Sequence, residues 1–122
     1  MTGNRNLVSY CVMGDAKTDL LQGTLDLIVL RLLRSGPANG WDITQSIQVI
    51  SKGALEINYG SVYPALRRLE ARGFVKAEWG TSDNNRRARY YELTAAGRKQ
   101  LATEREAWDR FSTALGLILD AG

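Results

Sequence analysis

Apolar residues recur at helical spacing in four stretches of the chain and alternate with polar residues in shorter ones. The first stretch predicts a helix from Leu20 to Ser35, with Asp19 as its N-cap and Gly36-Pro37 at its end. Its apolar stripe consists of Leu21, Leu25, Ile28 and Leu32. Additional leucines widen that stripe, so we expect this helix to be covered on most sides, by its own domain or by a partner chain.

Two more helices are predicted before residue 73. Asn39 can cap a helix over about residues 40–50, whose inward stripe is Ile43, Ile47 and Ile50. The next helix runs from about Gly60 to Arg72, with Pro64 in the first turn, where a missing N–H costs little. Between the two helices, Leu55 and Ile57 alternate with polar neighbours, which is compatible with a very short strand.

The third predicted helix has two distinct sides. Val62, Leu66 and Leu69 define the buried side. At about 100° per residue, the opposite side carries Pro64, Arg67, Arg68 and Ala71, flanked near its start by Ser61 and Tyr63. This polar, arginine-bearing side is therefore expected to face outward.

A β-hairpin and a long helix complete the pattern. Strands are predicted over Phe74–Trp79 and Arg87–Leu93, joined by turn-forming residues. Val75, Ala77 and Trp79 share one side of the first strand, and Tyr91 and Leu93 of the second face inward. Thr94 can cap a last helix that reaches about Leu119. This helix has a coiled-coil-like seam, interrupted at Glu104, of Leu101, Trp108, Phe111, Leu115 and Ile118.

Three helices followed by a hairpin predict a winged helix-turn-helix, here with a long C-terminal helix, so the fold class is mainly α with a small β-hairpin. We expect a flexible N-terminal arm over residues 1–18, in which Met13 is a candidate alternative start. A winged-helix DNA-binding domain is expected over residues 19–93, and a dimerisation helix over 94–122. A dimer would hide the apolar seam, which the small core cannot cover.

Positive charge is concentrated in one part of the chain. Residues 61–90 contain seven Lys or Arg and three Asp or Glu, a net charge of +4, whereas the whole chain has +3. A charge run by itself most often marks a solvated surface. Here the run coincides with the third helix and the hairpin, the two elements with which a winged helix contacts DNA. The pattern therefore favours nucleic-acid binding.

The composition argues against several kinds of chemistry. The chain has no His, which excludes His-based nucleophile triads and ordinary His-containing zinc sites, and it has one Cys, Cys11. No paired carboxylates or glycine-rich phosphate loop are recognisable, so we expect neither an enzyme nor a cofactor. No apolar run is long enough to span a membrane and no signal peptide is recognisable, so a cytoplasmic protein is expected.

Several motifs in order resemble the PadR family of transcriptional regulators. They are LLQGTLD at 20–26, GSVYPALRRLE at 60–70, GF at 73–74, WG at 79–80 and RRARYYELTAAG at 86–97. The resemblance covers about residues 18–119 and implies a cytoplasmic, dimeric regulator, usually a repressor released by a ligand or stress. The family usually has His-Gly-Tyr where this chain has Asn39-Gly40-Trp41, so no role of that His is transferred.

The candidate DNA contacts lie on the third helix and the hairpin. Tyr63 either reaches a phosphate or packs against the hairpin, and Arg67 and Arg68 read guanine or touch phosphates. Asn58 and Ser61 either bind phosphate or cap the helix. On the hairpin the candidates are Arg86, Arg87 and Arg89. Strand alternation favours Arg87 and Arg89 on the side opposite Arg86, and proximity to the tip favours Arg86 and Arg87. Pro64 completes the predicted set.

The predicted dimer and ligand residues are Leu21, Leu25, Leu101, Trp108, Phe111 and Leu115. Trp108 belongs either to the dimer core or to a platform for a small planar aromatic effector, since the resemblance implies that a Trp of this helix can sandwich such compounds. The competing interpretation of the whole chain is a winged-helix module that binds protein rather than DNA. The arginine-rich helix and hairpin favour double-stranded DNA as the partner of a homodimer.

Overall fold

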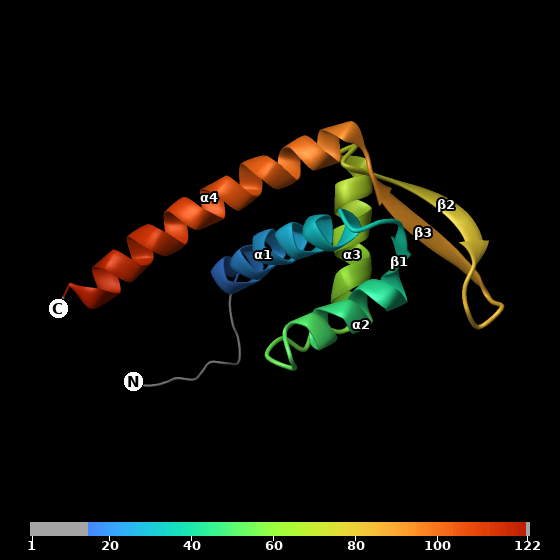
Figure 1. The fold of residues 1–122 in the computed structure, drawn as a ribbon, viewed down its shortest axis with the longest axis horizontal. Coiled ribbons are helices and arrows are strands. Elements are labelled where there is room, and N and C mark those ends of the chain that lie inside the picture. Colours follow the sequence, from blue (N-terminus) through green and yellow to red (C-terminus); the bar gives the residue numbers. More distant parts are fainter. Residues whose placement is uncertain (1–14, 122) are drawn as a thin grey trace.

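The computed structural model of the protein describes residues 15–121, with side chains from Gly23 onward. The elements are α1 (Asp15–Leu33), β1 (Ala38–Asn39), α2 (Gly40–Ile50), α3 (Tyr59–Ala71), β2 (Val75–Thr81), β3 (Arg87–Leu93) and α4 (Ala95–Asp120) (Figure 1). The strands form one antiparallel sheet in the order β1-β3-β2. The predicted fold class, a winged helix with a long C-terminal helix, is confirmed.

The start of the chain differs from the prediction. Residues 15–18, assigned to the flexible arm, are the first turn of α1, while residues 1–14, with Met13, lie outside the described part. Asp19 was expected to cap this helix, but it lies within it because the helical backbone begins at Asp15. The caps of α2 and α4 are as predicted. The Asn39 side chain accepts a hydrogen bond from the Asp42 N–H at 2.8 Å, and Thr94 Oγ1 accepts one from the Gly97 N–H at 3.0 Å.

The third strand of the sheet also differs from the prediction. The short strand expected at Leu55 and Ile57 is absent from the described structure, where both residues lie in the loop between α2 and α3. Instead, Ala38 pairs with Tyr91 on the free edge of β3. The reason is connectivity, since the turn after α1 brings Ala38 to that edge, which would otherwise expose unpaired backbone groups.

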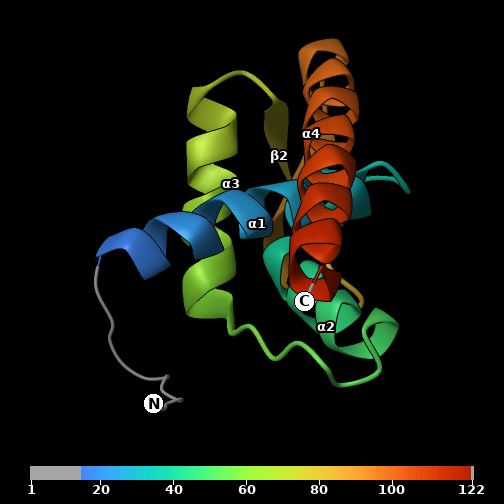
Figure 2. The same ribbon diagram turned by 90° about the vertical axis from the view of Figure 1, so that its left-hand side faces the viewer.

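The core forms where α3 crosses α1 next to the sheet, as the two views of Figures 1 and 2 show. Three predicted residues of α3 are fully buried there, namely Val62, Leu66 and Leu69. Tyr91 and Leu93 of β3, which were also expected to face inward, are buried as well. One prediction of burial is wrong. Ile50 is 68% exposed because it is the last residue of α2 and lies at the edge of a groove rather than in the core. Trp79 of β2 is also largely exposed, at 60%.

The helix α4 leaves the domain soon after it begins. Its only buried residues among those described are Gly97 and Leu101, and its C-terminal half extends past the start of α1 (Figures 1 and 2). The start of α4 is held next to the loop that precedes β2, because the Thr94 N–H donates a hydrogen bond to the Phe74 carbonyl at 3.1 Å. A Cβ at position 97 would overlap that same carbonyl, so only glycine allows this close approach.

We therefore expect Gly97→Ala to destabilise the domain by about 1–3 kcal/mol, because the overlapping atom is backbone and cannot rotate away. Thermal unfolding should show a Tm lower by roughly 5–15 °C. The matched control is Gly116→Ala in the same helix, where a Cβ would meet nothing within 4 Å. That change should leave Tm unchanged or raise it slightly, since alanine favours the helix. Equal effects of the two changes would contradict this account of the α4 anchor.

Candidate nucleic-acid interface

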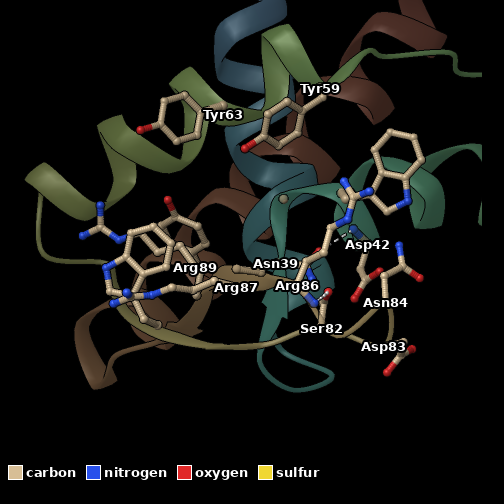
Figure 3. Close-up of a pocket in the computed structure, with 15 residues that line it drawn as sticks. Asn39, Asp42, Tyr59, Tyr63, Ser82, Asp83, Asn84, Arg86, Arg87 and Arg89 are labelled. Atoms are coloured by element: carbon tan, nitrogen blue, oxygen red, sulfur yellow. Dashed lines mark hydrogen bonds between the residues drawn. The ribbon is translucent and has the colours of Figure 1, made fainter.

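A groove separates the start of α3 from the hairpin. Its volume is about 940 Å³, and it is lined by residues from the start of α2, from α3 and from β2, β3 and their turn. Figure 3 shows Tyr59 and Tyr63 on the α3 side, and Arg86, Arg87 and Arg89 on the hairpin side. The fold thus brings together two elements that carry most of the arginines of the 61–90 segment.

On α3, Tyr63 and Arg67 form one unit on the outward side. The Tyr63 ring is half-buried, and its hydroxyl accepts a hydrogen bond from the exposed Arg67 guanidinium at 3.0 Å. This hydrogen bond, with the phenol nearby, raises the pKa of Arg67, so the side chain stays cationic. Ser61 and Pro64, also predicted contacts, are exposed near the start of the same helix.

Asn58 acts as the N-cap of α3. Its side-chain oxygen accepts a hydrogen bond from the Ser61 N–H at 3.0 Å. Of the two interpretations left open for Asn58, phosphate binding and capping, the geometry supports capping. The reason is local, because a residue in extended conformation directly before a helix brings its side-chain oxygen to an otherwise unpaired N–H.

Arg68 does not point outward with Arg67. Its guanidinium donates to Asp26 of α1 at 2.8 Å in a largely buried ion pair, and its Nε has no hydrogen-bond partner among the described residues. One residue along a helix rotates a side chain by about 100°, which turns Arg68 toward α1 while Arg67 faces solvent. This ion pair ties α3 to α1. The DNA contact of Arg68 stays a prediction.

The hairpin arginines differ in how they are held. The guanidinium of Arg89 donates to Glu70 of α3 at 2.8 Å, which links the hairpin to the helix. Arg87 lies over the Trp79 ring at 4.8 Å and remains exposed. Arg86 also lines the groove, although strand alternation placed it on the opposite side. The alternation of strand side chains does not apply to Arg86, because Arg86 lies in the turn before β3, which begins at Arg87. In this turn Asn85 has a φ of 60°.

Sequence reasoning missed part of the groove and the partners of two arginines. The aromatic side chains of Trp41, Tyr59 and Trp79 line it, with Tyr91 beneath them. The spacing of these aromatic residues along a helix or strand does not show whether their side chains line a groove or lie in the core. The carboxylates that hold Arg68 and Arg89 were missed because they lie on other elements, 42 and 19 residues away in sequence.

The predicted dimer residues separate into two groups. Leu25 and Leu101 belong to the core of their own chain, so they offer little surface to a partner. Trp108, Phe111 and Leu115 are between 41% and 54% exposed on α4. The side chain of Leu21 lies outside the described part of the structure. Of the five described side chains, Trp108, Phe111 and Leu115 therefore offer the surface for an interface.

The described residues form neither a metal site nor a membrane-spanning helix. Among the residues that the structure describes, no three His, Cys, Asp or Glu side chains gather where they could hold a metal ion. Within residues 15–121, no helix combines the length and apolar character that crossing a bilayer requires.

Comparison with known proteins gives one consistent result. Residues 29–103 match the family model described as the transcriptional regulator PadR-like family. The fold is similar to that of a transcriptional regulator from Clostridium thermocellum, with a TM-score of 0.73, 28% identity and coverage of 80% of this chain and 95% of that one. For a PadR family transcriptional regulator from Eggerthella lenta, the TM-score is 0.71, the identity 28%, and the coverage 88% and 91%. A transcriptional regulator from Mycobacterium tuberculosis is 35% identical over 65 residues, which are 53% of this chain and 60% of that protein.

The ion pair between Asp26 and Arg68 should stabilise the fold. We expect Asp26→Asn to cost about 1–3 kcal/mol, less than a fully buried pair, because the Arg68 side chain keeps 33% of its surface in water. Urea unfolding would measure the loss. The control is Lys76→Gln, which removes the exposed ion pair with Glu92 and should change stability by less than about 0.5 kcal/mol. A loss for Asp26→Asn no larger than for Lys76→Gln would show that the pair contributes nothing.

Proposed function

Because the chain belongs to the PadR-like family of transcriptional regulators, we propose that it binds an inverted-repeat operator as a homodimer and acts as a ligand- or stress-responsive repressor. The observation that carries the DNA contact is the exposed arginine pair on the hairpin, Arg86 and Arg87, facing the groove opposite Tyr63. Arg67 adds a third exposed cation on the adjoining side of α3.

In this proposal α3 enters the major groove of DNA, which is wide enough for one helix, and the hairpin lies along the neighbouring backbone. Arg67 then contacts guanine or phosphate, with Ser61, Tyr63 and Pro64 near the start of the helix. Arg86 and Arg87 contact phosphates, where their charge releases counterions. Arg89 serves to hold the hairpin on α3 through Glu70, at the distance that the ion pair sets.

The proposed homodimer rests on α4 and on a second groove. Trp108 and Phe111 are exposed neighbours on α4, with ring centroids 6.0 Å apart. Trp108 borders a groove of about 930 Å³ between α1, the end of α2 and α4, whose apolar lining includes Leu27, Ile28 and Ile50. A helix of a partner chain bound in this groove would cover both the groove and the Trp108–Phe111 pair, which a single chain leaves exposed to water. Two-fold symmetry then presents two α3 helices about 34–36 Å apart, matching an inverted repeat.

The alternative is a winged-helix module that binds protein. The three unpaired arginines Arg67, Arg86 and Arg87 around α3 and the hairpin favour DNA, because nothing in the described ion pairs neutralises them. A gel shift with fragments of the source genome and with random DNA at physiological salt separates the two. Retarded genomic fragments support the regulator, and no retardation of either supports the module.

The hairpin contact has a salt-dependence signature. Replacing both Arg86 and Arg87 with Ala should flatten the slope of log K against log salt by up to about 1.8, since each lost phosphate contact accounts for about 0.9. Fluorescence anisotropy of a labelled operator over a salt series would give the slope. Lys99→Ala is the control, because Lys99 is exposed on α4 and lines neither groove. If the double variant kept the original slope, the hairpin would not be part of the interface.

The dimer contact is tested on α4. Phe111→Glu puts a charge into the proposed apolar interface, so sedimentation should shift from dimer to monomer, and operator affinity should fall at least tenfold. Thr113→Glu adds the same charge at an exposed position about 200° around the helix and should leave the dimer intact. Circular dichroism would establish that both variants fold. A Phe111→Glu protein that still sediments as a dimer would place the interface elsewhere.

A further inference from the structure

The second groove, between α1, the end of α2 and α4, has a mainly aliphatic lining. Its volume of about 930 Å³ falls within the range of roughly 300–1,000 Å³ that small-molecule sites occupy. The aliphatic side chains that line it include Leu27, Ile28, Leu32, Ile47, Ile50 and Leu55. Among the described residues, Trp108 is the one aromatic member of this lining. Such a lining favours a flexible hydrocarbon chain over a flat ring, which gains most from stacking on other rings.

Three exposed arginines that line the same groove have no carboxylate partner in the described structure. Arg31 lies in the last turn of α1, Arg34 directly follows that helix, and Arg98 lies in the first turn of α4. Arg31 donates a hydrogen bond to the Ser35 hydroxyl at 3.4 Å, which leaves its charge uncompensated. Since α1 and α4 run in opposite directions in Figure 1, Arg34 and Arg98 come from the same end of this helix pair. The groove therefore has a cationic end.

The carboxylates of the lining are paired elsewhere. Asp109 accepts a hydrogen bond from Arg105 at 3.2 Å, and Glu106 forms an ion pair with Arg110 at 3.2 Å. Both pairs join residues four apart on α4, so they neutralise charges of that helix and not the cationic end of the groove. An aliphatic lining with free guanidinium groups at one end is the complement of a molecule that has a hydrocarbon chain and an anionic head.

A second copy of the chain would satisfy only half of this groove. Residues 111–119, the exposed part of α4, have the sequence FSTALGLIL, which contains no charged residue. A partner's helix bound in the groove through this stretch would cover the aliphatic lining but bring no negative charge to the arginines. A ligand that carries its own anionic group would satisfy both features.

From these observations we propose that the second groove binds an aliphatic anion, such as a free fatty acid. The carboxylate binds Arg34 and Arg98, because a guanidinium holds a carboxylate through two parallel hydrogen bonds. The hydrocarbon chain extends along Ile28 and Ile50 toward Trp108, where each buried methylene group strengthens binding. The ligand then competes with a partner's helix for the same lining. This competition rests on the proposed function, whereas ligand binding itself does not.

The three tryptophans allow a direct test by NMR. In the intact protein, the indole N–H signal of Trp108 reports on the second groove, and those of Trp41 and Trp79 report on the groove between α3 and the hairpin. Titration with decanoate, below the concentration at which it forms micelles, should shift the Trp108 signal and leave the other two in place. No shift of Trp108 at millimolar decanoate, or equal shifts of all three signals, would overturn the proposal.

Two related probes separate the contributions of the head and the chain. The neutral 1-decanol lacks the charge that the arginines bind, and hexanoate lacks four of the methylene groups that the aliphatic lining covers. Each should bind at least tenfold more weakly than decanoate. Equal affinity of 1-decanol and decanoate would rule out the arginine contact, and equal affinity of hexanoate and decanoate would rule out burial of the chain.

Replacing both Arg34 and Arg98 with Gln tests the cationic end. Both side chains are exposed, so the fold should be kept, and affinity for decanoate should fall at least tenfold while affinity for 1-decanol stays the same. Lys99→Gln is the matched control, because it removes an exposed positive charge beside Arg98 that does not line the groove. A double variant that binds decanoate as tightly as the unmodified protein would overturn the role of the arginines.

Operator binding is measured separately on the same samples. A protein that binds decanoate but no DNA would refute the proposed function and leave the ligand site standing. In a DNA-binding protein, saturating decanoate should shift sedimentation from dimer to monomer and release the operator. An operator complex that persists at saturating decanoate would refute the competition between ligand and partner helix.

Discussion

Four residues on one side of α3, namely Val62, Ala65, Leu66 and Leu69, are completely removed from water, and the rest of the structure depends on this burial. It fixes the helix across α1 and next to the sheet, and so decides which residues of α3 can meet another molecule. Burying such side chains contributes about 1.5–3 kcal/mol for each of the larger ones. Ion pairs then refine the position of a helix that the core has already placed.

These ion pairs divide the arginines into two classes. Arg68 and Arg89 are each held by a carboxylate on another element, at 2.8 Å, and connect α3 to α1 and to the hairpin. Arg67, Arg86 and Arg87 have no such partner among the described residues. Part of the positive charge of the segment therefore aligns α3 with its neighbours, and the rest is free for the anionic partner that we propose. The internal pairs hold the helix and the hairpin together, which the proposed recognition of a regular double helix requires.

The groove between α3 and the hairpin is lined by aromatic side chains as well as by arginines. Phosphate contacts demand charge and exposure, whereas Tyr59, Tyr63 and Trp79 supply flat faces around a cavity. The C-terminal half of α4, with its apolar seam, points away from the hairpin in Figure 1, so the proposed pairing of chains and the groove between α3 and the hairpin involve different residues.

The sequence by itself determined the order of the four helices and the hairpin, the caps at Asn39 and Thr94, the buried side of α3 and the arginine-rich segment, because each depends on local spacing or on hydrogen bonds within a few residues. Only the tertiary structure decided that Arg68 turns to Asp26, that Arg89 turns to Glu70, that Ala38 completes the sheet and that Ile50 stays in water. Each of these outcomes depends on which residue of a distant element lies opposite. Periodicity along one helix or strand carries no information about that partner, so the contacts between elements emerge only when the chain is folded.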